Sequence, residues 1–214
     1  MKSIAASACQ TGARAVFGLM FLSLAGCSLP LPDKPVRPQP YDLGPALPAA
    51  ADAQPTGTAL ALEPVVAPAA IDGTQIVYRL AYADGGQQPR PYAQARWTMA
   101  PPQLVTQRLR EALSARRPVV EAGAGLAPLE LRAELDEFAH VFSAPNASEG
   151  VVRLRVTATA PNARAGRLLG QRTFTVRQPA ASADAPGGTA ALRAATDEVV
   201  RQVVAWVDGL PAPR

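Results

Sequence analysis

The apolar residues near the carboxyl end of this chain recur at the spacing of a helix. The series is Leu192, Ala195, Val199, Val203, Trp206 and Leu210, with steps of three or four residues. Such steps predict an amphipathic α-helix, which has to cover a second layer to bury its apolar stripe. Thr189 is a suitable N-cap for this helix, and Gly209 is a suitable end. The chain is therefore expected to fold in layers, with this helix laid on a sheet.

Alternating apolar and polar residues predict the strands of that sheet. The segments concerned are residues 58–66, 74–82, 129–142, 150–160 and 168–177. In the third segment the apolar residues change strand faces, from Leu131 and Leu135 to Phe138 and Phe142. Such a change predicts a bulge or a bend. Residues 161–167 are turn-forming, so the last two strands are expected to form an antiparallel hairpin.

A second helix is predicted from Pro102 to about Arg116. Its apolar stripe consists of Leu104, Val105, Leu109, Ala112 and Leu113. Arg108, Arg110 and Glu111 are expected to face away from the core. The preceding residues 92–102 are expected to be an irregular approach to this helix.

The order of these elements predicts the fold class. Strands and helices do not alternate strictly, as they would in a parallel α/β fold. We expect an α+β fold: a largely antiparallel sheet with two amphipathic helices packed on one face.

The first part of the chain has the pattern of a secretory signal. Lys2 and Arg14 are the only charged residues before Cys27, and residues 15–25 are apolar or small. About eleven such residues are too few to span a bilayer, which needs roughly twenty. Residues 24–27, Leu-Ala-Gly-Cys, resemble the lipobox of bacterial lipoproteins. That resemblance implies removal of residues 1–26 and three acyl chains on Cys27. A soluble periplasmic protein whose signal ends near a cysteine stays the alternative.

These features predict three parts: a lipoprotein signal peptide (1–26), a proline-rich tether (27–40) and one α+β domain (41–214). Proline recurs at nearly every second or third position of the tether, which disfavours helix and ladder formation. Either an extended polyproline-like strap or a disordered segment would act as a tether. At about 3.1 Å per residue, an extended strap would span roughly 40 Å.

Composition excludes several functions. The net charge is +4 and the arginines are scattered, with Arg116-Arg117 as the only adjacent pair. Nucleic-acid binding would require a basic patch with interleaved aromatic residues, so no nucleic-acid partner is expected. The only cysteines are Cys9 and Cys27. Once Cys27 is acylated, no thiol remains for a disulfide or a metal. No metal site is expected, and no cofactor other than the covalent lipid on Cys27.

The chain offers few residues for catalysis. His140 is the only histidine and shares a strand face with Phe138 and Phe142, which favours a hydrogen-bonded residue of the sheet over a catalytic one. Residues 134, 136 and 137 are acidic, and we interpret them as a solvated strand face rather than an acid/base pair. No enzyme is expected, and a periplasmic hydrolase is the enzymatic alternative.

Arg96, Trp97, Pro101 and Pro102 are candidates for a protein contact. Arginine and tryptophan are both enriched at binding hot spots. The alternative is that Trp97 packs under the following helix while Arg96 pairs locally.

Four segments carry a family resemblance. They are residues 41–45 (Tyr-Asp-Leu-Gly-Pro), 71–79, 92–102 continuing into 104–113, and 131–142 with Ser148 and the strand at 172–176. Together they resemble the auxiliary lipoproteins of ABC-type transport systems, the family that includes paraquat-inducible protein C. The similarity covers nearly the whole chain after Cys27, in order. The residues after Pro45 are smaller than is usual in the family.

The resemblance implies an outer-membrane lipoprotein, anchored on the periplasmic side. It would work with an MCE-domain protein and an ABC transporter that moves lipids between the two membranes, docking or capping their assembly. Ser28 is consistent with outer-membrane sorting, and a homo-oligomer stays open. The alternative is a lipoprotein of another envelope machine, for lipopolysaccharide assembly or secretion.

Overall fold

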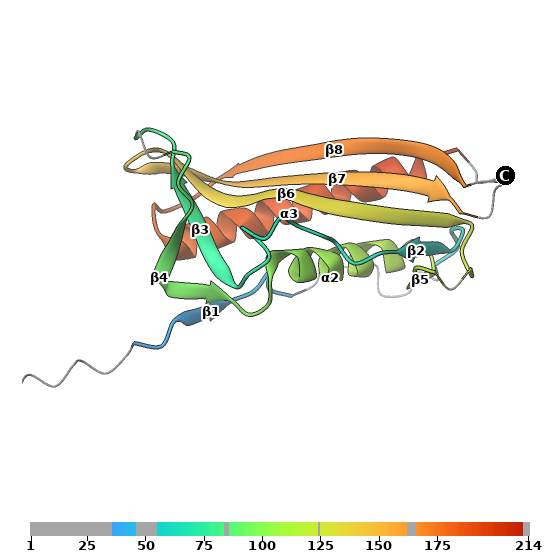
Figure 1. Ribbon diagram of the computed structural model, residues 1–214, viewed down its shortest axis with the longest axis horizontal. Helices are drawn as coiled ribbons and strands as arrows, with labels where there is room; N and C mark the ends of the chain where they lie inside the picture. Colours follow the sequence, from blue (N-terminus) through green and yellow to red (C-terminus); the bar gives the residue numbers. More distant parts are fainter. Residues whose placement is uncertain (1–35, 46–54, 84–85, 124, 162–165, 212–214) are drawn as a thin grey trace, which may run out of the picture. The chain divides into compact units, whose positions relative to one another are not determined.

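A computed structural model of the chain describes residues 36–45, 55–83, 86–123, 125–161 and 166–211. The predicted signal peptide, Cys27 and most of the predicted tether lie outside these residues. The residues from Arg37 onward form one compact unit (Figure 1).

The elements alternate irregularly between strands and helices. Their order is β1 (Gln39–Tyr41), β2 (Leu60–Leu62), β3 (Gln75–Leu80), β4 (Arg90–Trp97), α2 (Pro101–Ser114), β5 (Val119–Glu121), β6 (Leu129–Ala144), β7 (Ala147–Ala160), β8 (Arg167–Pro179) and α3 (Ala185–Asp208). Both helices and the four predicted strands at β3, β6, β7 and β8 are present. The predicted strand at 58–66 is shorter, and the approach expected to be irregular contains most of β4. The end of the predicted tether is ordered as β1.

The sheet is mixed, so the expectation of a largely antiparallel sheet is not confirmed. Strands β6, β7 and β8 form an antiparallel ladder, and β3 and β4 are also antiparallel. However, β2 and β3 both pair with β6 in parallel, β5 pairs in parallel with β2, and β1 with β4. Since β7 pairs along the whole of β6, strands β2 and β3 share the other edge of β6. The long connections before β6 let the chain return in the same direction, which parallel pairing requires.

The predicted change of strand face in β6 is confirmed. The register with β7 shifts between Leu135 and Glu137. Before the shift Leu131 and Leu135 are buried, and after it Phe138, His140 and Phe142 are buried. One extra residue in β6 reverses the side-chain alternation, as expected of a bulge.

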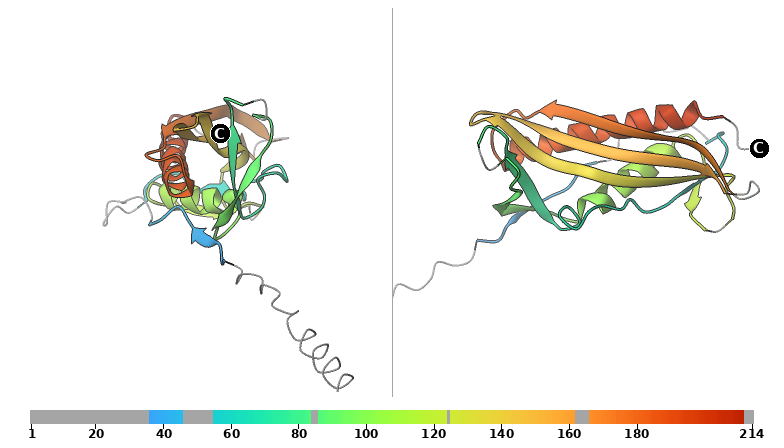
Figure 2. Two further views of the ribbon diagram at one scale, coloured as in Figure 1. Left: turned by 90° about the vertical axis from the view of Figure 1, so that its left-hand side faces the viewer. Right: turned by 45° about the horizontal axis from the view of Figure 1, so that its top comes forward.

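Helix α3 lies along β6, β7 and β8 (Figures 1 and 2). It begins earlier than predicted, because its N-cap is Asp184, whose carboxylate accepts a hydrogen bond from the Gly187 N–H at 2.8 Å. Thr189 is instead a buried residue inside the helix. Helix α2 packs against α3 and β5.

Two glycines allow α3 to approach the sheet closely. A Cβ on Gly188 would lie 2.3 Å from Nδ1 of His140, and one on Gly150 would lie 2.5 Å from the Leu192 nitrogen. Any side chain larger than hydrogen would push the helix away from β6 and β7.

The predicted apolar stripe of α2 is buried, but the polar side of this helix differs from expectation. Leu104, Val105, Leu109 and Leu113 belong to the core. Arg108, expected to face solvent, is only 2% exposed. Its guanidinium reaches backbone carbonyls of residues 43–45, far away in the sequence. In the described part of the chain, neither helix is long and apolar enough to cross a membrane.

Candidate functional site

The segment that follows β1 enters the space between the two helices. Strand β1 joins β4 in parallel, with Gln39 opposite Ala95, and the Thr98 N–H donates to the Tyr41 carbonyl at 2.8 Å. Residues 42–45 then turn: the Asp42 carboxylate accepts from the Gly44 N–H at 2.7 Å. Gly44 has a φ of 67°, which favours glycine. The turn directs Leu43 into the core, where it is 4% exposed.

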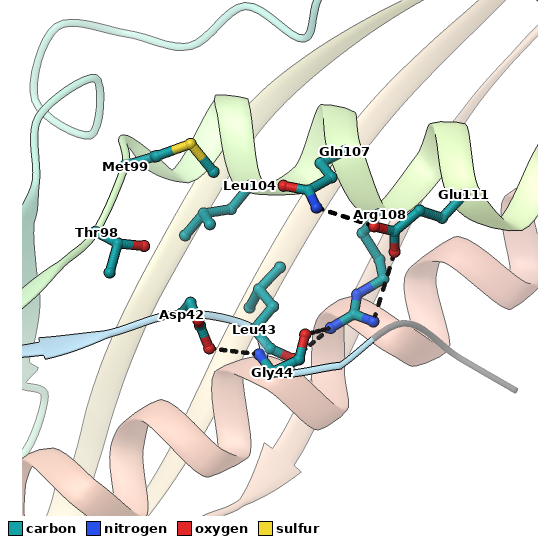
Figure 3. A pocket seen from close by; sticks show the side chains of 9 residues that line it. All are labelled: Asp42, Leu43, Gly44, Thr98, Met99, Leu104, Gln107, Arg108 and Glu111. Carbon is teal, nitrogen blue, oxygen red and sulfur yellow. Dashed lines mark hydrogen bonds and ion pairs between the residues drawn. The ribbon is translucent and has the colours of Figure 1, made fainter.

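The guanidinium of Arg108 fastens this segment. It donates to the carbonyl oxygens of Pro45 at 2.7 Å, of Gly44 at 3.3 Å and of Leu43. Figure 3 shows the guanidinium reaching from α2 to the turn. A buried arginine is costly unless its N–H groups are satisfied, and three backbone carbonyls satisfy them here. We call residues 43–45 with Arg108 the carbonyl clamp.

The clamp also links the two helices. Nε of Arg108 lies 3.3 Å from Oδ1 of Asp197 on α3, an ion pair without hydrogen-bond geometry. Glu111 lies 3.8 Å from the Arg108 guanidinium on its other side. Burial raises the pKa of Asp197, and the charge of Arg108 opposes that rise. Removing Arg108 would therefore leave a buried carboxylate without its closest positive charge.

A pocket lies beside the clamp. Its volume is about 110 Å³. The lining residues are Asp42, Leu43, Gly44, Thr98, Met99, Leu104, Gln107, Arg108 and Glu111 (Figure 3). Within the described residues, no group of three or more histidine, cysteine, aspartate or glutamate side chains could hold a metal ion. The arrangement holds a segment of chain and contains no nucleophile paired with a base.

His140 is part of the packing between β6 and α3. Its ring is fully buried, and Nδ1 lies 2.8 Å from the Tyr92 hydroxyl. Burial lowers the pKa of His140, and burial likewise raises the pKa of Tyr92. In the described residues Nε2 has no hydrogen-bond partner. The ring is thus a hydrogen-bonded residue of the sheet, as the sequence indicated, and Gly188 packs against it.

The acidic residues of β6 pair with arginines of β7. Asp136 accepts a hydrogen bond from Arg155 at 2.8 Å, and Glu134 lies 3.5 Å from the same arginine. Glu137 is 3.4 Å from Arg153. These are cross-strand ion pairs at the surface, and Arg155 faces both Glu134 and Asp136. The fourth acidic residue of β6, Glu130, instead lies beside Glu63, and burial together with this neighbour raises the pKa of Glu130.

The adjacent arginines Arg116 and Arg117 share one carboxylate. Both pair with Asp208 at the end of α3, which Nη2 of Arg116 approaches to 2.8 Å. Burial raises the pKa of Asp208, but the hydrogen bonds from the two arginines outweigh burial and lower it. Their positive charge is therefore largely used within the domain.

The four residues predicted to contact a protein partner differ in exposure. Trp97 is 2% exposed and packs edge-to-face on Phe138, with ring centroids 5.5 Å apart. Pro101 and Pro102 are buried in the first turn of α2. Only Arg96 is exposed. Arg108 was not predicted as a site residue, although a polar residue inside an apolar stripe was a signal for it.

Fold and site together define a class of protein: a small α+β domain whose amino-terminal segment is fixed to its helices by the carbonyl clamp. The chain belongs to the family of the ABC-type transport auxiliary lipoprotein component, whose model matches residues 41–204. The match begins at Tyr41, immediately before the clamped turn. Among the curated proteins no match was found.

Solved structures share the fold. Protein XCC0632 from Xanthomonas campestris is 18% identical, with a TM-score of 0.65 over 79% of this chain and 94% of its own. An uncharacterized protein is 14% identical, with a TM-score of 0.63 over 80% and 99%. The hypothetical protein CT253 from Chlamydia trachomatis is 12% identical, with a TM-score of 0.51 over 71% and 96%. At these identities the likeness concerns the fold alone.

Proposed function

We propose that this protein is a non-enzymatic, outer-membrane-anchored subunit of an envelope lipid-transport system. It would dock or cap an assembly of an MCE-domain protein and an ABC transporter. Membership of the transport auxiliary lipoprotein family, over residues 41–204, is the observation that carries this proposal. The resemblance to the paraquat-inducible protein C group supports the finer assignment.

The anchor is proposed to be Cys27. Its place after Leu24, Ala25 and Gly26 supports cleavage and acylation, and Ser28 supports sorting to the outer membrane. Two or more acyl chains hold a protein stably on a membrane, whereas one binds marginally. The carbonyl clamp supports this role, because it fixes the chain to both helices shortly after the tether.

The role of the domain is proposed to be contact with partners. Lipidation would confine the domain near one membrane and so raise its effective concentration for a partner there. Arg96 is the exposed member of the predicted contact group, while Trp97, Pro101 and Pro102 would support it from the core. A homo-oligomer is compatible with this role, and no nucleic-acid partner is proposed.

Absence of catalysis is also part of the proposal. The burial of His140 and the ion pairs of the β6 carboxylates support it, since the ring is closed off from solvent and the carboxylates already face arginines. A hydrolase would require such a group at an accessible site.

Crosslinking in living cells tests the proposal. The native lipidated protein, purified after mild crosslinking, is expected to co-isolate an MCE-domain protein. The Cys27→Ala variant is the matched control and should lose most of this capture. Capture of a lipopolysaccharide-assembly or secretion component instead would overturn the lipid-transport assignment in favour of another envelope machine.

A further inference from the structure

The arginines of this domain fall into two groups. Arg37, Arg79, Arg90 and Arg96 lie on β3 and β4 or just before β1, and we call them the basic patch. Among the described residues none of the four has a carboxylate within 4.0 Å. In contrast, most arginines of α2, β6, β7 and α3 have such a partner. Of the seven described arginines without such a partner, these four lie on or next to neighbouring strands of the sheet.

The strands of this part contain no acidic residue. Their sequences are QPY in β1, QIVYRL in β3 and RPYAQARW in β4. The hydrogen bonds of the patch go to neutral acceptors: Arg79 donates to the Gln87 carbonyl at 3.1 Å, and Arg90 to the Gln88 side chain at 3.3 Å. These bonds orient the guanidinium groups and leave their charge uncompensated.

Sheet pairing places the four arginines on or next to three adjacent strands. Strand β4 lies between β1 and β3. Arg96 is opposite Pro40 of β1, and Arg90 is opposite Tyr78, the neighbour of Arg79. Arg37 precedes β1 by two residues. Arg79 and Arg90 thus lie at one end of the β3–β4 hairpin, on opposite faces of it, and Arg96 lies at the other end, opposite Gln75.

Exposed apolar side chains flank the patch. Tyr82 follows β3 by two residues and is 47% exposed, while Met99 follows β4 by two residues and is 37% exposed. Arginine beside exposed tyrosine and methionine is the composition of surfaces that sit at a lipid–water interface.

The short distance along the chain from Cys27 to the basic patch indicates what the patch binds. Arg37 follows Cys27 by only ten residues, which span at most about 35 Å when fully extended. If Cys27 is acylated, as the proposed function holds, the patch cannot leave the neighbourhood of the bilayer surface. We propose that the basic patch docks the domain on the phosphate headgroups of anionic phospholipids. Arg96 then has a lipid partner instead of the protein partner expected from the sequence.

Docking would also orient the domain. Strands β3 and β4 lie at one end of the β6–β8 ladder, and β2 and β5 lie at the other (Figures 1 and 2). With the patch on the membrane, the end that carries β2 and β5 points away from it. That end is then the one presented to other proteins of the envelope.

Vesicle binding by the non-acylated chain tests the inference. Protein from Ser28 to Arg214 keeps every described residue and removes the acyl chains. In flotation it is expected to bind phosphatidylcholine vesicles that contain phosphatidylglycerol, and not pure phosphatidylcholine. Binding should disappear near 1 M salt, where the Debye length is about 3 Å. The triple variant Arg79→Gln, Arg90→Gln, Arg96→Gln should bind roughly 100-fold more weakly, at about fivefold per arginine.

The control removes the same charge elsewhere. Arg110, Arg167 and Arg172 also lack a carboxylate within 4.0 Å among the described residues, and Arg172 lies over the ring of Phe174. Their triple change to glutamine should alter vesicle binding less than twofold. Thermal unfolding of both triple variants verifies that the domain still folds.

Three results would overturn the inference. The non-acylated chain could fail to bind anionic vesicles, or the control variant could lose as much binding as the patch variant. Thirdly, the patch variant could lose affinity for a purified MCE-domain protein while the vesicles bind neither form, which would make the patch a protein contact. Failure of the proposed function is seen separately, in the crosslinking and fractionation of the native lipidated protein.

Discussion

Nη1 of Arg108 donates a hydrogen bond to the carbonyl oxygen of Pro45, at 2.7 Å across 63 residues of sequence. Through this bond a residue in the middle of helix α2 holds the segment that follows the predicted tether. The same guanidinium is paired with Asp197 of α3, so three distant parts of the chain meet at one side chain.

Replacing Arg108 with methionine is expected to lower the free energy of unfolding by about 3–5 kcal/mol. Three carbonyls of residues 43–45 lose their donor, and the half-buried Asp197 keeps only the longer ion pair with Arg193, at 3.9 Å. The double variant Arg108→Met, Asp197→Leu should lose less than the single variant. Urea unfolding measures both. Arg110→Met, on the same helix but only half-buried, is the control. A single variant as stable as the wild type would show that the clamp contributes nothing.

His140 should make stability depend on pH. Burial lowers its pKa in the folded state, whereas an unfolded histidine titrates near about 6.5. Above that pH both states are neutral and the contribution is complete. As the pH falls below about 6.5, the unfolded state takes up a proton first, and the stability decreases until the folded-state pKa is reached. Chemical unfolding between about pH 5 and pH 8, the range in which histidine titrates, measures this slope.

The control for this slope is His140→Gln, which does not titrate. His140 is the only histidine, so the difference between the two proteins isolates its contribution from those of the carboxylates. Identical slopes in the wild type and the variant would mean that the ring titrates normally in the folded state.

Gly188→Ala is expected to destabilise the domain by about 1–3 kcal/mol, since the added methyl group overlaps the His140 ring. Gly73→Ala is the matched control: nothing lies within 4 Å of its added Cβ, and the glycine has no positive φ. Differential scanning calorimetry should show a lower Tm for the first and an unchanged Tm for the second. Equal Tm values would contradict the close approach of α3 to β6.

Cys27→Ala is expected to leave the folded domain intact while abolishing salt-resistant attachment to the membrane and function. The change removes the proposed site of acylation and touches none of the described residues. Membrane fractionation and circular dichroism measure the two effects. A variant that still fractionated with the outer membrane after a high-salt wash, which removes electrostatic binding by the basic patch, would exclude Cys27 as the anchor.

The long periodic elements could be predicted from sequence because their patterns are local. Strands β6, β7 and β8 and the two helices follow from alternation and helical spacing, and the bulge in β6 follows from the change of face after Leu135. Strand β4 was missed because Pro91 and Ala93 interrupt the alternation. Its place in the sheet depends on pairing with β1 and β3, which no local pattern encodes.

The start of α3 and the role of Arg108 were missed for a related reason. The two glycines after Pro186 favoured a later helix start. Both lie inside the helix, and they are glycines because Ser182 and His140 occupy the space that their side chains would need. Arg108 was expected at the surface because arginine is charged. The backbone carbonyls that hold it in the interior are more than sixty residues away in the sequence. Both errors concern contacts that only the tertiary structure defines.

The parallel pairing of β1 with β4 has a mechanical consequence. If the chain before Gln39 is pulled along the strand axis, the hydrogen bonds of β1 are sheared together instead of being peeled apart one after another. Behind them the carbonyl clamp resists the same displacement from a second direction. Tension on the amino-terminal segment is therefore borne first by the sheet and then by the helix pair, and release requires both to fail in turn.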